Sequence, residues 1–214
     1  IQPESNDVKY SGSALYCPSP FGEKLNSSAG GGMNRNSAET ALLNGSDQGI
    51  ATLAAASSWT LEAWVKKSDR RYGDYAGAGV WLAINSSSGG NRVLMSCNNT
   101  LSNGWDANVA NVAVLYNSTH SAFNHDWQHQ AVVWTGSAYR FFVDGKFVAS
   151  SNSTNNKIND GDILALFNEA DLASGGYNNC ATGVIIDSIR IVSGQVLYSG
   201  GSSAGDVAFT PGDI

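Results

Sequence analysis

The acidic side chains best spaced for chemistry occur in two pairs. Asp160 and Asp162 are separated by one residue, and so are Glu169 and Asp171. Alternate side chains on a strand share one face about 7 Å apart, an arrangement suited to glycan hydrolysis by two carboxylates. Both pairs fall at expected loop edges without a third carboxylate in phase, and Glu62 stands alone on its strand. The sequence therefore favours a protein that is not an enzyme, with Glu169 and Asp171 as the candidates if it were a hydrolase or esterase.

Two histidines raise the alternative of a zinc site. His125 and His129 lie four residues apart, a spacing that places both rings on one face of a helix. The segment HDWQHQAVVW, residues 125–134, is instead expected to be extended, and four residues of strand separate the two rings by about 13 Å. That distance argues against a shared metal ion, and His129 is expected to have a structural role.

A calcium site is the one cofactor hypothesis that the sequence supports. Asn159, Asp160 and Asp162 offer the hard oxygen ligands that this cation prefers. The same residue types are common in tight turns, and the sequence contains no EF-hand pattern. The interpretation without any cofactor therefore stands beside the calcium hypothesis.

Aromatic residues in three expected loops are suited to bind sugars. Sugar rings present apolar faces and hydroxyl groups, which exposed aromatic rings and nearby amide or carboxylate groups can hold on firmly anchored loops. The three loops span residues 69–77, 98–108 and 168–179. Their candidate ligand-binding residues are Tyr72, Tyr75, Trp105, Tyr177 and Asn179. The alternative is that these side chains only cover the ends of the core.

The composition is that of a globular chain with many loops. Of its 214 residues, 42% are apolar, 14% are charged and 24 are glycine. The net charge of −6 argues against nucleic acid as a partner, because such binding needs clustered Lys and Arg. No apolar run approaches the roughly 20 residues that cross a bilayer, so membrane insertion is not expected.

The apolar pattern predicts antiparallel strands and few helices. In WTLEAWVKK, residues 59–67, alternate positions are apolar, as in a strand with one face on the core. Asp144-Gly145 suits the two positive φ angles of a type I′ hairpin turn. Regular segments of this kind are expected at residues 41–45, 50–53, 80–84, 92–97, 109–116, 130–134, 139–143, 163–167, 184–192 and 196–198.

Strands joined by turns, without intervening amphipathic helices, indicate sheets packed face to face. We therefore predict an all-β fold, an antiparallel jelly-roll β-sandwich over residues 38–214. Residues 1–37 have weak periodicity and are predicted to form an N-terminal arm or linker, in which residues 8–16 are a candidate first strand.

Four stretches and a short tail resemble one family. VIIDSIRIVSGQVLY, residues 184–198, carries an Asp and an Arg on an apolar strand and passes through a Ser-Gly turn toward FTP at residues 209–211. WTLEAWVKK, HDWQHQAVVW and YRFFVDGKFV, the last at residues 139–148, precede it in that family's order. The chain resembles laminin-G-like members of the concanavalin A-like lectin/glucanase superfamily. Its ending is most similar to the branch found in bacteriophage tail and virion-surface proteins.

The resemblance implies a function and a set of partners. It implies a noncatalytic recognition module on a bacteriophage virion surface, in a tail fibre, spike or head appendage, that binds host cell-surface glycan for attachment. It implies an extracellular location, contact with other virion proteins through the N-terminal arm, and a homo-oligomer, with a trimer favoured. Asp187 matches a recurring Asp of the family, whose expected role is to accept hydrogen bonds at the sheet edge.

Two other functions remain open at this point. One is a structural capsid or tail decoration protein without a small ligand, which the sequence barely separates from a glycan-binding module. The other is a polysaccharide-active enzyme that cleaves or deacetylates an envelope polymer.

Overall fold

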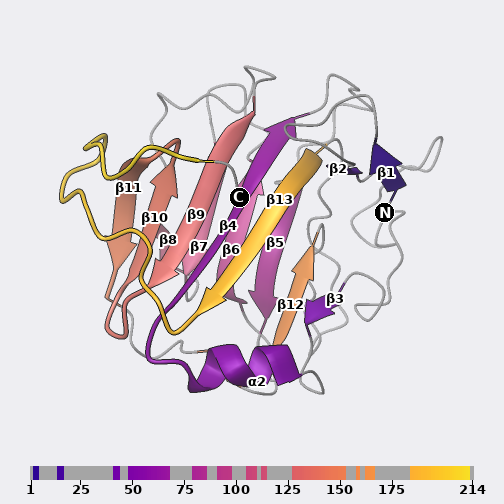
Figure 1. Ribbon diagram of the computed structural model, residues 1–214, viewed down its shortest axis with the longest axis horizontal. Helices are drawn as coiled ribbons and strands as arrows, with labels where there is room; N and C mark the ends of the chain where they lie inside the picture. Colours follow the sequence, from indigo (N-terminus) through magenta and orange to yellow (C-terminus); the bar gives the residue numbers. More distant parts are fainter. Residues whose placement is uncertain are drawn as a thin grey trace.

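The computed structural model describes residues 2–4, 14–16, 41–43, 48–67, 79–85, 91–97, 105–109, 112–114, 127–152, 158–159, 162–166 and 184–212. Within these ranges the chain is mostly β, and its strands form two sheets in separate layers (Figure 1). Every strand pair described is antiparallel, consistent with the predicted β-sandwich. In these ranges no helix is long and apolar enough to cross a membrane.

The larger sheet has seven described strands. Their order across the sheet is β1 (Gln2–Glu4), β2 (Ala14–Tyr16), β13 (Val184–Ser193), β4 (Trp59–Lys67), β9 (Gln128–Trp134), β10 (Tyr139–Val143) and β11 (Lys146–Ser151). The smaller sheet has six, in the order β3 (Ala41–Leu43), β12 (Ile163–Leu166), β5 (Gly79–Asn85), β6 (Asn91–Cys97), β7 (Trp105–Val109) and β8 (Val112–Val114). β13 therefore pairs with strands from early in the chain, on one side with β2 and on the other with β4.

The main core lies between the two sheets, and the alternation in β4 determines which side chains enter it. Trp59, Leu61, Ala63 and Val65 are all buried in this cluster, as predicted from their spacing. Removing apolar side chains from water is the chief stabilising contribution of such a core, at roughly 25 cal/mol per Å². Facing residues from the smaller sheet are Leu82, Ile84, Val93, Met95 and Leu164.

The outer face of the larger sheet is covered by the end of the chain. Residues 194–212, which we call the C-terminal strap, leave β13 and run over β9, β10 and β11 (Figure 1). At the edge of the sheet the N–H of Phe147 donates to the carbonyl of Asp206 at 2.9 Å, and the N–H of Ala208 donates to Gly145 at 2.8 Å. The outer cluster beneath the strap consists of Ala131, Val133, Phe142 and Phe147 from the sheet with Tyr198, Ala208 and Phe209 from the strap.

The turn between β10 and β11 has the predicted conformation. Asp144 and Gly145 have φ angles of 49° and 74°. Gly145 also lies against the strap, where a Cβ atom would stand 2.0 Å from the carbonyl oxygen of Phe209. Glycine is required here by its backbone angle and by the approach of the strap.

Two segments predicted as extended are not strands. Residues 50–53 lie within helix α2 (Gln48–Ala55), which closes one end of the sandwich (Figure 1). Leu53 and Ala54 of this helix pack against the main core. Short apolar runs fit a helix and a strand equally well by periodicity, and here the helix places its apolar face on the core.

Residues 196–198 belong to the strap and are not in a strand. The reason is visible in their hydrogen bonds, because the N–H of Leu197 donates to the Oγ1 atom of Thr60 at 3.1 Å. Thr60 Oγ1 in turn donates to the carbonyl of Gln195 at 3.1 Å. The Thr60 side chain thus makes the hydrogen bonds to residues 195 and 197 that the backbone of a neighbouring strand would otherwise make.

The N-terminal region adds two short strands to the larger sheet. β1 pairs with β2, and β2 pairs with β13 through Tyr16 opposite Ile185. The boundary at residue 37 between an arm and the sandwich stays a prediction.

Candidate functional site

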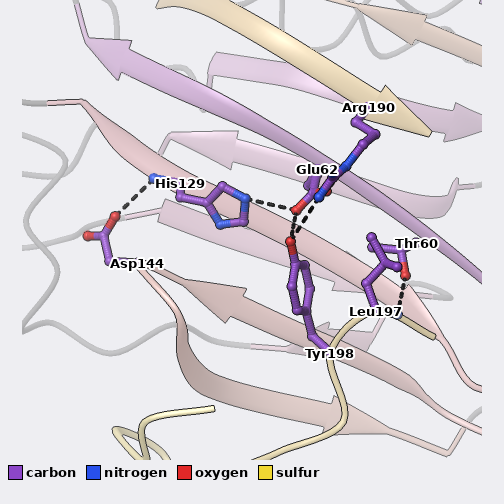
Figure 2. A network of polar contacts seen from close by, with 7 residues as sticks. All are labelled: Thr60, Glu62, His129, Asp144, Arg190, Leu197 and Tyr198. Atoms are coloured by element: carbon purple, nitrogen blue, oxygen red, sulfur yellow. Dashed lines mark hydrogen bonds and ion pairs between the residues drawn. The ribbon is translucent and has the colours of Figure 1, made fainter. Parts of the chain in front are cut away.

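The described part of the chain contains one buried network of charged and polar side chains, centred on Glu62. This residue projects from the middle of β4 toward the strap, and it is 0% exposed. Its Oε2 atom accepts hydrogen bonds from the Nε2–H of His129 at 2.9 Å and from the hydroxyl of Tyr198. Its Oε1 atom is bound by the guanidinium of Arg190 (Figure 2). Both carboxylate oxygens are therefore occupied.

Four separate parts of the chain supply this network. Arg190 lies directly opposite Glu62 in the pairing of β13 with β4. Ala131 is opposite Glu62 on the other side, so His129 sits diagonally across on β9, within reach of a long side chain. Tyr198 comes from the strap, and its hydroxyl also accepts a hydrogen bond from Arg190 at 3.2 Å.

A β-bulge in β13 brings Arg190 to this face. Asp187 is paired with Trp64 and Arg190 with Glu62, so three steps along β13 match two steps along β4. The extra residue is accommodated near Ser188, whose φ of 54° is unusual for a residue other than glycine. Because of this insertion, Ile186 and Arg190 can face opposite sides of the sheet although they are four residues apart.

Burial and hydrogen bonding together determine the charge states at neutral pH. Burial alone raises the pKa of the Glu62 carboxyl, but hydrogen bonds from His129, Tyr198 and Arg190 outweigh it and hold the pKa below its ordinary value of 4.5. Burial, together with the hydrogen bond to Glu62, raises the pKa of Tyr198 to about 12. Burial lowers the pKa of Arg190, but the hydrogen bond and charge of Glu62 raise it overall. An anionic carboxylate thus meets a neutral phenol and a cationic guanidinium.

His129 is held in one orientation by its surroundings. An ionised carboxylate only accepts hydrogen bonds, so the Nε2 atom facing Glu62 carries the hydrogen. The ring makes edge-to-face contacts with Trp64 at 5.4 Å, Tyr198 at 6.1 Å and Phe209 at 5.6 Å between centroids. The backbone N–H of His129 donates to Asp144 Oδ1 at 2.9 Å. The structural role predicted for this histidine agrees with these contacts.

Arg140 of β10 makes a second attachment to the strap. Its guanidinium donates to the carbonyls of Ser199 at 2.7 Å, Gly200 at 2.8 Å and Gly201. It also lies over the ring of Phe147, 4.9 Å from the centroid. Three consecutive carbonyls of the strap therefore converge on one cation.

This network holds the strap and is poorly suited to transform a substrate. A general acid or nucleophile needs a free oxygen within reach of the reacting group, whereas both oxygens of Glu62 are engaged by protein groups. The chemistry that the arrangement supports is structural, namely the fastening of residues 195–209 to the sheet.

Most of the predicted ligand-binding residues fall outside the described ranges. Tyr72, Tyr75, Tyr177 and Asn179 lie there, so their placement stays a prediction. Trp105 opens β7, where its backbone pairs with Cys97. The candidate acids Glu169 and Asp171, like His125, also lie outside.

Two of the three predicted calcium ligands are described, and they are hydrogen-bonded to each other. The N–H of Asn159 donates to Asp162 Oδ2 at 2.9 Å, and the N–H of Asp162 donates to the carbonyl of Asn159 at 3.0 Å. Asp162 is buried and Asn159 is exposed, while Asp160 lies outside the described ranges. Among described residues there is no group of three or more His, Cys, Asp or Glu placed to hold a metal ion. The calcium hypothesis stays a prediction.

The sequence contained a partial signal for the network. Glu62 occupies an outward position in an otherwise regular strand, and Arg190 stands within the IDSIR motif. What the sequence did not show is that the two are directly opposite, 128 residues apart, with His129 and Tyr198 beside them.

The arrangement of two antiparallel sheets agrees with the result of a family comparison. A laminin-G domain model, described as Concanavalin A-like lectin/glucanases superfamily, matches residues 44–199. The chain belongs to this superfamily. The matched range begins just before α2 and ends one residue after Tyr198, so it includes all members of the Glu62 network. A comparison of this sequence with curated proteins found no match.

Several solved structures are similar to this superfamily member at low identity. A heptameric SAP-like pentraxin from Limulus polyphemus is 14% identical, with a TM-score of 0.45 and 64% of each chain covered. The CBM40 of a Ruminococcus gnavus IT-sialidase bound to α2,3-sialyllactose is 14% identical, with a TM-score of 0.47, and the match covers 72% of this chain and 84% of that one. A Trypanosoma rangeli sialidase is 14% identical with a TM-score of 0.48, and this chain spans only 21% of its length. Similarity at this level does not extend to a ligand or an activity.

Proposed function

We propose that this superfamily member is a noncatalytic recognition module that binds glycan through its loops. The superfamily is described by its lectins and its glucanases, so binding and cleavage of sugars are the two functions to separate. The observation that carries the proposal is the burial and hydrogen bonding of the Glu62 carboxylate. This carboxylate projects from the centre of the larger sheet, yet it is fully buried and bonded to His129, Arg190 and Tyr198.

A glucanase site on this face would need an accessible carboxylate, whereas Glu62 is buried and bonded to Tyr198 of the strap. Binding does not require a catalytic group on the sheet, because a rigid sandwich only has to anchor the loops that carry aromatic and amide groups. The residues proposed to contact sugar are Tyr72, Tyr75, Trp105, Tyr177 and Asn179.

The biological setting that we propose is the surface of a bacteriophage particle, where the module attaches to a host envelope glycan. This rests on the resemblance of residues 184–198 and of the FTP tail to phage virion-surface proteins. A homo-oligomer, with a trimer favoured, is proposed with it, because repetition of a weak site raises the effective affinity without new contacts.

Binding to a glycan array and to host envelope fractions tests the proposal, with the protein presented both alone and as a multimer. We expect selective binding that Trp105→Ala or Tyr72→Ala reduces at least tenfold while the melting temperature is retained. The matched control is Val207→Ser, a change at a side chain that is 75% exposed on the strap. Absence of binding in every format would count against recognition and favour a decoration protein, which electron microscopy of the particle would then locate.

Cleavage is tested separately by incubation of the protein with purified capsule or envelope polysaccharide. We expect no release of oligosaccharide or acetate. Release that disappears in a Glu169→Gln and Asp171→Asn double variant would replace the binding proposal with an enzymatic one.

A further inference from the structure

The strap has an apolar cluster of its own. Phe141 and Phe142 are neighbours on β10, but Phe141 faces the main core and Phe142 faces the outer cluster. The larger sheet thus separates the two clusters, so loss of the outer one leaves the space between the sheets closed. The strap begins at Gly194, which has a φ of 81° and whose N–H donates to the carbonyl of Ser58 at 2.8 Å.

The Glu62 carboxylate is a charged group of the sheet to which the strap is hydrogen-bonded through Tyr198. Glu62 accepts from Tyr198 on the strap and from His129 and Arg190 on the sheet, and Arg190 donates to the Tyr198 hydroxyl as well. The ring of Tyr198 is stacked on Phe209 with 3.6 Å between centroids and 9° between planes. Movement of Tyr198 therefore disturbs the apolar contacts of the strap at the same time.

From this geometry we propose that the C-terminal strap is a latch that opens without unfolding the sandwich when Glu62 gains a proton or Tyr198 loses one. A proton on Glu62 removes the negative charge that three donors share. A proton lost from Tyr198 places a second negative charge against the carboxylate. The guanidinium of Arg190 is then hydrogen-bonded to both negatively charged side chains.

The direction of each step follows from the two pKa shifts. Burial opposes the charge on Glu62 but hydrogen bonds lower its pKa overall, so its stabilising contribution is complete above pH 4.5 and is lost as pH falls through the lowered value. Burial and the bond to Glu62 raise the pKa of Tyr198 to about 12, so its contribution is complete below pH 10 and is lost as pH rises toward 12. The latch is closed between these limits.

Other charged groups on the same face define the controls. His129 from β9, Arg190 from β13 and Tyr198 from the strap face Glu62 directly. Farther out are Lys66 of β4, Asp187 of β13, Arg140 of β10, Asp144 of the hairpin turn and Asp206 of the strap. Asp206 is the chief competitor as an acid trigger, because its pKa is lowered by the backbone N–H groups of Ser202 and Ser203.

Opening would expose a surface that the closed protein hides. Its floor contains the rings of Trp64, His129 and Phe142 beside the carboxylate of Glu62. None of these floor residues is among those proposed to bind glycan, so the latch does not depend on that proposal.

Methyl NMR of the full chain between pH 3 and pH 12 tests the latch, because methyl signals persist where amide signals exchange. Ala131, Val133 and Ala208 report on the outer cluster, and Val132, Ile84 and Leu164 on the main core. We expect the outer signals to change first at both pH limits, each step changing the opening equilibrium about tenfold per pH unit as for one proton. Outer and core signals that change together at both limits would overturn the proposal.

Three variants assign the steps. Glu62→Gln is expected to shift the outer signals at pH 7 toward their acid positions and to remove the acid step. Tyr198→Phe is expected to remove the alkaline step and to keep the acid step, moved to higher pH because one donor to Glu62 is lost. Asp206→Asn is expected to leave both steps in place. If Asp206→Asn removes the acid step, or if Tyr198→Phe retains the alkaline one, the assignment to this latch is wrong. Tyr198→Phe keeps the test decisive should Glu62→Gln fail to fold.

Discussion

The two faces of the larger sheet are stabilised in different ways. Between the sheets, Trp59 and Trp134 pack on Tyr139 with centroid distances of 5.8 Å and 4.6 Å, and most of the other members of this core are aliphatic. Beneath the strap, the apolar cluster is smaller and is accompanied by the Glu62 network and by the carbonyl contacts of Arg140. The inner face depends on buried area, whereas the outer face depends on hydrogen-bond geometry, so the two should respond differently to mutation and to pH.

The largest expected effect comes from Phe141→Ala, which leaves a cavity in the main core. Such a change costs about 4 kcal/mol of global unfolding free energy, and denaturant unfolding followed by Trp fluorescence measures it. The matched change one residue along, Phe142→Ala, affects the outer cluster instead. Its effect on global unfolding is limited to the free energy of closing the strap, so it should be the smaller of the two. Equal losses would show that the two clusters unfold as one unit.

The next effect concerns the close approach of the strap to the hairpin. Gly145→Ala combines a positive φ with a Cβ atom 2.0 Å from the Phe209 carbonyl, while Gly194→Ala has a similar φ and open space around it. A side chain at positive φ costs about 1 kcal/mol by itself. We expect Gly194→Ala to cost about that amount, and Gly145→Ala to cost more and to increase hydrogen exchange at the Ala208 and Phe209 amides. Similar exchange in both variants would contradict the tight contact.

A smaller effect is expected where the strap meets a side chain of β4. Thr60→Val removes the acceptor of the Leu197 N–H and the donor to the Gln195 carbonyl without much change in shape. Loss of such bonds costs about 1 kcal/mol each. Faster exchange of the Leu197 amide, with unchanged exchange in β9, is the expected result. Thr60→Ser keeps the hydroxyl and serves as the control.

The smallest effect is expected at the bulge, which both faces share. Ser188→Gly relieves a positive φ but adds freedom to the unfolded chain, so the stability should change by less than about 1 kcal/mol in either direction. Ser188→Val is expected to destabilise the protein, because β-branched residues are poorly tolerated at positive φ. Thermal unfolding of the pair checks the sign. A Val variant as stable as the Gly variant would mean that the backbone there readily changes conformation.

The sequence predicted those parts of the fold that depend on neighbouring residues, namely the inward face of a strand and a hairpin turn. The alternation from Trp59 to Val65 gave the inward face of β4, and Asp144-Gly145 gave the hairpin turn. The interpretation of residues 196–198 as a strand was wrong, because Tyr198 packs in the outer cluster and the N–H of Leu197 donates to a threonine side chain. The interpretation of residues 50–53 as extended was wrong for a different reason, since a short apolar run does not specify its period and these residues lie in helix α2.

The candidate site was harder to predict, because its partners are brought together by strand order. Glu62 meets groups that are 67, 128 and 136 residues away in the sequence. Nothing in the spacing of His129 or Tyr198 indicates that β9 and the strap converge on β4. An isolated acidic residue at an outward position of a central strand was the available signal, and it indicates a buried partner more directly than a catalytic role.

The single extra residue near Ser188 has a consequence for which changes β13 can accept. Ile186 and Ile191 are five positions apart and both contact the interior, which a strand of uniform alternation does not allow. Deleting one residue there would turn the guanidinium of Arg190 inward and Ile191 toward the solvent side. The length of this short stretch is therefore strongly constrained, and substitutions compatible with the positive φ at Ser188 should be accepted where insertions and deletions are not.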